Sequence, residues 1–166
     1  MIYPSDAVRQ TVSLPGLPVV SAPDARGEGL LATGYRTADR LLRRLLLAHV
    51  FLVFALAPLH GTWRAALLAG VPIIALGWFA AWRWEGRLVA RMAIATALLS
   101  MSALIIHQSG GMIEMHFHIF AILAFLLLYR DWRVPVAGAV VTALHHVLFN
   151  LLQTSGGDAR IFQHHE

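Results

Sequence analysis

The stretch GGMIEMHFHIF, residues 110–120, places one carboxylate and two imidazoles close together and then runs into the apolar segment 121–129. An ionisable side chain in a membrane-length apolar segment is costly, so it is a candidate functional residue. On a helix, Glu114 and His118 lie four residues apart and share a face, whereas His116 projects nearly opposite. The stretch therefore predicts an apolar helix with polar side chains on two faces.

The composition of the whole chain is that of a membrane protein. Of 166 residues, 58% are hydrophobic and only 13% are charged, whereas about a quarter are charged in soluble domains. The net charge of +4 comes from arginines without any lysine, and such charges report membrane orientation rather than a nucleic-acid partner. The absence of cysteine excludes disulfides, thiolate metal sites and thiol redox chemistry.

Five apolar segments approach the ~20 residues that a helix needs to cross a bilayer. Their short connections force neighbouring helices to run antiparallel. The sequence predicts an all-α fold, an integral membrane helical bundle of five transmembrane helices in up-down topology, with a sixth span expected beyond the chain. The predicted spans are Leu45–Leu59, Ala65–Trp82, Leu88–His107, Met112–Tyr129 and Val134–Gln153.

The remaining segments complete the predicted domain organisation. Residues 1–34 contain several Pro and Gly and are expected to form a flexible N-terminal tail. A short juxtamembrane helix is predicted at 35–44, so the bundle as a whole covers 35–153. Residues 154–166 are expected to form a C-terminal tail on the outer face.

The arginines predict the orientation of this bundle. They concentrate before the first predicted span and in the second and fourth connections, whereas the first connection has only Arg64 and the third has none. Because positive charge is retained on the cytoplasmic side, the N-terminus is predicted to be cytoplasmic and the C-terminus outside. The expected location is the bacterial inner membrane, as a multi-pass protein.

Histidines from antiparallel spans reach one predicted layer in the outer half of the bilayer. At ~1.5 Å per residue, His116 and His118 lie roughly 6–9 Å deep, and His145 and His146 lie roughly 10–12 Å deep. His107 would cover this layer from the outer surface. The candidate cofactor-binding residues are His107, Glu114, His116, His118, His145, His146 and Asn150, and the candidate metal ligands among them are Glu114, His116, His118, His145 and His146.

Neutral imidazole is a good ligand for Zn, Cu, Fe and haem iron. We expect His118 and His146 to bind one centre, with Glu114 as a ligand or as an orienting group. A b-type haem suits one histidine from each facing helix, whereas a bare Cu, Fe or Zn ion suits the crowded group around residues 114–118. The alternative is a set of hydrogen-bonded core histidines without any cofactor.

Three blocks of sequence resemble a known family of membrane domains. These blocks are HQSGGMIEMHFHIF (107–120), YRDWR (129–133) and HHVLFNLLQ (145–153). Together they resemble the multi-span sensor domain that precedes the signalling region of bacterial methyl-accepting chemotaxis proteins and related membrane-bound sensors. The resemblance covers residues 38–162. It implies a sensory module with inward-facing histidines, followed in the family by a further span and a cytoplasmic effector.

The leading hypothesis is therefore a sensory input module of a chemotaxis-type receptor, without catalytic residues of its own. The alternative is a metal- or haem-dependent membrane oxidoreductase, and a transporter or purely structural bundle is a third interpretation. The expected partners are membrane lipid, a second copy of the chain in a homodimer, and a cytoplasmic signalling domain or kinase pathway reached through the missing C-terminal region. No nucleic-acid partner is expected.

Overall fold

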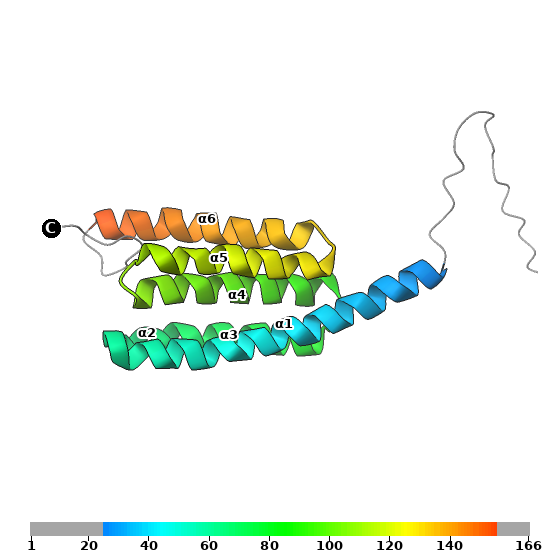
Figure 1. Ribbon diagram of the computed structural model, residues 1–166, viewed down its shortest axis with the longest axis horizontal. Coiled ribbons are helices and arrows are strands. Elements are labelled where there is room, and N and C mark those ends of the chain that lie inside the picture. The colour runs from blue at the N-terminus through cyan, green and yellow to red at the C-terminus, as the bar shows by residue number, and fades with distance from the viewer. Residues whose placement is uncertain (1–24, 156–166) are drawn as a thin grey trace, which may run out of the picture.

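The computed structural model describes residues 25–155, which form a bundle of helices without any strand (Figure 1). The all-α membrane bundle predicted from the sequence is confirmed. The segments 1–24 and 156–166, with most of both predicted tails, lie outside the described residues. In chain order the helices are α1 (Ala25–His60), α2 (Trp63–Ala65), the π-helical η1 (Ala66–Gly70), α3 (Val71–Arg83), α4 (Leu88–Gln108), α5 (Ile113–Leu126), the 3₁₀-helical η2 (Leu127–Tyr129) and α6 (Arg133–Thr154).

Helix α1 is longer than the sequence pattern predicted. The expected juxtamembrane helix and first span form one helix, which begins at Ala25 within the segment expected to be a flexible tail. Residues 25–57 contain no proline and are rich in Ala, Leu and Arg, which favour a helix. At ~1.5 Å per residue, α1 is longer than the ~30 Å apolar core of a bilayer. Its N-terminal part projects beyond the other helices (Figure 1).

The second crossing segment, Trp63–Arg83, is one continuous rod composed of α2, η1 and α3. Its π-helical turn at Ala66–Gly70 ends two residues before Pro72. Proline has no backbone N–H and therefore cannot complete the bond to the preceding turn. Such local widening at a proline is an ordinary way for a helix to continue without a break.

Helix α4 is the centre of the bundle. In its most apolar window 67% of residues are buried, against 17–28% in the other three long segments. Figure 1 shows α4 between α5 on one side and the α1 and α3 pair on the other. Close packing on α3 requires Gly77, because a Cβ at that position would lie 2.5 Å from the Cβ of Ala97. The helices α1, α3, α5 and α6 therefore all pack against α4.

Four helical segments in residues 25–155 are long and apolar enough to cross a membrane, and Ile113–Tyr129 is a shorter apolar segment. The last four segments agree with the predicted spans to within two residues. Large apolar side chains such as Phe51, Leu68 and Phe117 are exposed on the outside of the bundle. An outward-facing apolar surface of this kind is what a lipid environment requires. Turns of a few residues join antiparallel neighbours, as predicted.

Candidate functional site

The histidines form two separate groups, which we call the histidine pair and the groove histidines. The histidine pair consists of His49 on α1 and His118 on α5, whose Nε2 atoms lie 3.1 Å apart. Ser102 on α4 lies 2.8 Å from Nδ1 of His118. The pair therefore joins the first helix directly to the fifth, and the Ser102 hydroxyl joins the fifth to the central helix.

The hydrogen bonds of the histidine pair determine which nitrogen carries each proton. Nδ1 of His49 lies 2.7 Å from the carbonyl oxygen of Leu45, which can only accept, so this nitrogen is the donor. Nε2 of neutral His49 is then an acceptor, and Nε2–H of His118 donates to it. The Ser102 hydroxyl then donates to the remaining nitrogen of His118, 2.8 Å away, and shares that proton with the carbonyl of Leu98, 3.1 Å away. Two neutral imidazoles thus have all four nitrogens satisfied in one directed chain.

The groove histidines are His107 on α4, His116 on α5, and His145 and His146 on α6. Of these, His107 and His145 line the groove described below, and His116 and His146 lie beside them. The ring centroids of His145 and His146 lie 5.3 Å apart, and those of His116 and His146 lie 5.7 Å apart. Phe149 packs between helices, 4.3 Å from the ring of His145 and 6.1 Å from that of His107. The structure thus brings together four of the seven predicted site residues.

His145 differs from every residue of the histidine pair. Its side chain is buried, with 9% of the residue exposed, and neither ring nitrogen has a hydrogen-bond partner among the described residues. It lines a groove of about 550 Å³ whose walls are mostly apolar. Ordinary ligand sites have volumes of ~300–1,000 Å³. The other lining residues are Ala65, Ala69, Ile73, Ser100, Ala103, Leu104, His107, Val141, Leu148 and Phe149.

Backbone hydrogen bonds define the tautomers of His146 and His116, the two histidines next to His145. Nδ1–H of His146 donates to the carbonyl of Thr142 at 2.8 Å, and Nδ1–H of His116 donates to the carbonyl of Met112 at 3.1 Å. In each neutral ring the Nε2 atom therefore carries the lone pair. A backbone carbonyl that holds one nitrogen is the usual support for a metal-binding histidine. The structure thus prepares two further imidazoles as acceptors or ligands.

Glu114 and Asn150 lie outside both groups. Both are exposed, and Glu114 occupies the first turn of α5. His118 is placed with His49 rather than with His146, its predicted partner. In residues 25–155 no group of three His, Cys, Asp or Glu is close enough to hold a metal ion. The ion site expected around residues 114–118 stays a prediction.

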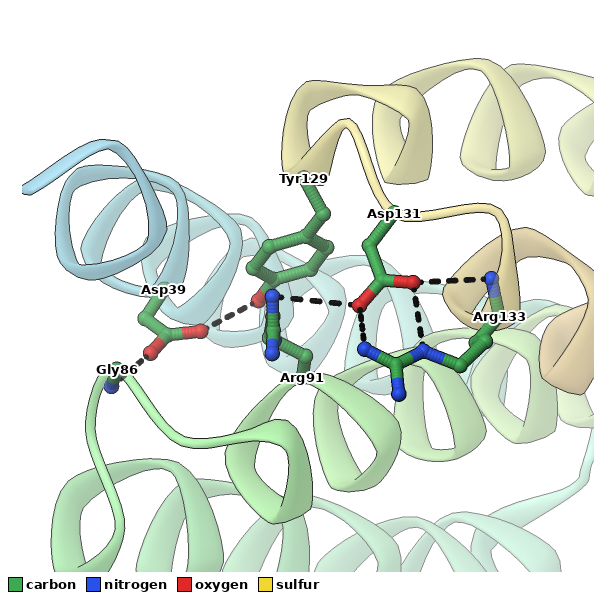
Figure 2. Close-up of polar contacts among 6 residues, drawn as sticks. All are labelled: Asp39, Gly86, Arg91, Tyr129, Asp131 and Arg133. Carbon is green, nitrogen blue, oxygen red and sulfur yellow. Dashed lines mark hydrogen bonds and ion pairs between the residues drawn. The ribbon is translucent and has the colours of Figure 1, made fainter. Parts of the chain in front are cut away.

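A second polar cluster, at the opposite end of the bundle, was not predicted (Figure 2). Asp39 on α1 is fully buried and accepts from the hydroxyl of Tyr129 at 2.7 Å and from the backbone N–H of Gly86 at 2.6 Å. It thereby fastens α1 to the end of α5 and to the turn before α4. The short juxtamembrane helix predicted at 35–44 gives no indication of this role, because the contacts of Asp39 depend on α1 being continuous.

Next to Asp39, an ion-pair network closes the turn between α5 and α6. The carboxylate of Asp131 accepts two side-chain bonds from Arg133 at 2.9 and 3.0 Å and lies 3.3 Å from Arg91. The Arg91 guanidinium also stacks 3.8 Å from the ring centre of Tyr35. The side-chain hydrogen bonds from Arg133 are the main reason why the pKa of Asp131 lies below its ordinary value. The arginines that predicted orientation therefore also join helices.

Comparisons with known proteins point in one direction. No family model matches the chain, and no solved structure matches it. The chain is 29% identical over 151 residues to a transducer protein of Halobacterium salinarum, Transducer protein Htr8. The match covers 83% of this chain and 23% of that protein, so the chain spans less than a quarter of its relative's length. This similarity supports a role in signal transduction, as a membrane sensor related to chemotaxis transducers.

Proposed function

We propose that this chain is the membrane-embedded sensory input module of a chemotaxis-type receptor, and that it senses through a haem or a transition metal held by the groove histidines. Similarity to a transducer supports the sensory role. The site assignment rests on one observation. His145 is a buried imidazole without a hydrogen-bond partner, on the wall of an apolar groove.

That observation matters because buried polar groups are nearly always paired. Leaving one unpaired costs about 1–3 kcal/mol, and such groups usually mark a functional requirement. The histidine pair shows that this bundle can satisfy a buried imidazole with its own groups. A bound ligand is therefore the proposed partner of His145.

The arrangement suits haem better than a bare ion. Haem iron needs only one or two protein ligands, whereas a structural ion usually takes four, and no group of three ligands lies together in residues 25–155. An apolar groove of about 550 Å³ with an aromatic wall at Phe149 matches a flat, apolar cofactor. His145 would be the first ligand. His107, which lines the same groove, would be the second, and His146 would be the alternative.

The residues themselves suggest how binding would reach the rest of the bundle. His107 belongs to the central helix α4 and His145 to α6, so a group held by both would set how α6 packs on α4. A bound haem would supply a redox-active iron that takes up small ligands. A change at the site would shift the balance between two packings of the bundle. The histidine pair and the Asp39 cluster would hold α1 in place meanwhile.

The rest of the receptor is proposed on the same basis. Positive charge at the Asp39 end favours a cytoplasmic N-terminus. Output would then require a further span, a cytoplasmic signalling domain and a homodimer. Reporter fusions after residue 24 and after residue 155 test the orientation. They should give opposite sidedness, and the same sidedness at both ends would contradict it.

The decisive experiment is reconstitution of the purified chain with haem and, separately, with Cu, Fe or Zn. A strong Soret band at one haem per chain is the expected result, together with no turnover of redox substrates by the isolated bundle. Stoichiometric metal with a featureless spectrum would assign an ion instead. A chain that binds neither would show that the groove histidines are core residues, and catalytic turnover would favour an oxidoreductase.

A further inference from the structure

A second groove lies at the other end of the bundle, where α1 leaves the remaining helices. It has a volume of about 410 Å³ and is formed between the N-terminal half of α1 and the end of α5. Its apolar lining includes leucines that remain exposed, such as Leu30, Leu41 and Leu128. Of the described residues that line it, Arg130 alone is charged.

A bilayer that covers the apolar segments of the bundle would have its headgroup layer near this groove. The bundle ends at the turn before α4, where Gly86 bonds Asp39 and Arg91 stacks on Tyr35. The α1 residues before Tyr35 extend past that level (Figure 1). Trp132, in the adjoining turn, is 73% exposed, as is usual for an interfacial aromatic residue. The groove therefore runs from the apolar core toward the headgroup layer.

Arg130 is free to meet an anion. Its side chain is exposed and has no ion pair or hydrogen bond with any described residue. Its neighbours are engaged, because Arg40 and Arg43 lie near Glu85 while Arg91 and Arg133 bond Asp131. Arg130 is also the one non-glycine residue in 25–155 with positive φ, at 51°. A left-handed residue is uncommon outside glycine, asparagine and aspartate.

We propose that this groove binds one anionic phospholipid, with its phosphate at Arg130 and an acyl chain along the leucines of α1. Charge complementarity carries the choice of ligand. The end of the bundle is rich in arginine, and basic pockets between membrane helices bind anionic headgroups. Zwitterionic lipid would gain the apolar contacts without the net attraction. The site is independent of the groove histidines, which lie at the far end.

Two pairs of variants test this site in the full chain. Arg130→Asn removes the charge but keeps a residue that tolerates the left-handed conformation, and Arg64→Asn is its control at the exposed start of the second segment. Gly34→Leu fills the groove, since an added Cβ at Gly34 meets open space. Gly29→Leu is the matched control, because Gly29 also has open space and does not line the groove.

The measurement is native mass spectrometry of the detergent-purified chain, titrated with phosphatidylglycerol or phosphatidylcholine of the same acyl chains. The wild-type chain should bind one phosphatidylglycerol about fivefold more tightly than phosphatidylcholine, and Arg130→Asn should remove that preference. Gly34→Leu should weaken both lipids, and both controls should match wild type. Equal losses for Arg64→Asn and Arg130→Asn would overturn the proposal. So would a dimer that Gly34→Leu disrupts without changing lipid binding, because a second copy would then cover the groove.

Discussion

His118 and His145 both lie on apolar helices of one bundle, but they differ in the hydrogen bonds of their ring nitrogens. His118 belongs to a directed chain in which its neighbours satisfy both of its nitrogens. His145 has no hydrogen-bond partner among the described residues, although it is buried. The two rings therefore differ in whether their nitrogens have partners, and the proposed ligand-binding role of His145 rests on that difference.

The same comparison applies to the carboxylates. Asp39 is buried with both oxygens used, one by Tyr129 and one by Gly86. Glu114, which the sequence singled out, is exposed near the start of α5. Satisfied buried groups stabilise this bundle, whereas unsatisfied or exposed groups remain available to ligands.

Replacing His145 should have the largest effect. We expect His145→Ala to abolish haem binding nearly completely, beyond the ~10–100-fold that loss of a supporting group costs. His118→Ala should retain binding, because that ring is already bonded. Titration of each purified variant with haem, followed at the Soret band, measures the difference. Equal losses in the two variants would break the distinction between the histidine pair and the groove histidines.

Asp39→Asn should be the most destabilising of the polar substitutions. An amide cannot accept both bonds as a carboxylate does, and hydrogen bonds to charged groups contribute about 1.5–3 kcal/mol each. We expect the free energy of unfolding in detergent to fall by about 3 kcal/mol. Glu114→Gln is the control and should change it by less than about 0.5 kcal/mol. A similar result for both carboxyl groups would refute the proposed contrast.

Removing one member of the histidine pair should have an intermediate effect. His118→Leu leaves Nε2 of His49 without its donor, and an unsatisfied buried group costs about 1–3 kcal/mol. The double variant with His49→Leu should lose less free energy of unfolding than the two single variants added together. With both rings removed, no imidazole nitrogen is left unpaired. Additive losses in this double-mutant cycle would show that the two rings do not interact.

Acid should have the smallest effect, through Asp131. Because the pKa of Asp131 is lowered in the folded chain, its contribution is present above its ordinary value of 3.8 and is lost as pH falls through the folded pKa. Thermal unfolding in detergent should therefore show a drop in stability below about pH 4. Asp131→Asn should flatten this part of the profile. An unchanged profile in that variant would assign the acid sensitivity to other carboxylates.

The sequence predicted the crossing segments well because an apolar helix in lipid must satisfy its own backbone and has a minimum length. It failed at α1, where arginines interrupt the apolar pattern while the helix continues through them. For the same reason Asp39 and Tyr129 were overlooked as partners. An aspartate inside the predicted juxtamembrane helix at 35–44 gives no signal until that helix is known to pass the turn at Gly86.

Sequence alone determined that several histidines lie in apolar helices, because depth along a helix follows from counting residues at ~1.5 Å each. It also determined that His145 and His146 point in different directions, from the turn of the helix. Which histidines meet was decided only by the tertiary structure. Pairing depends on which helices are neighbours and how each is rotated, and the packing around α4 sets both. That packing placed His118 against His49 and left His145 facing a groove.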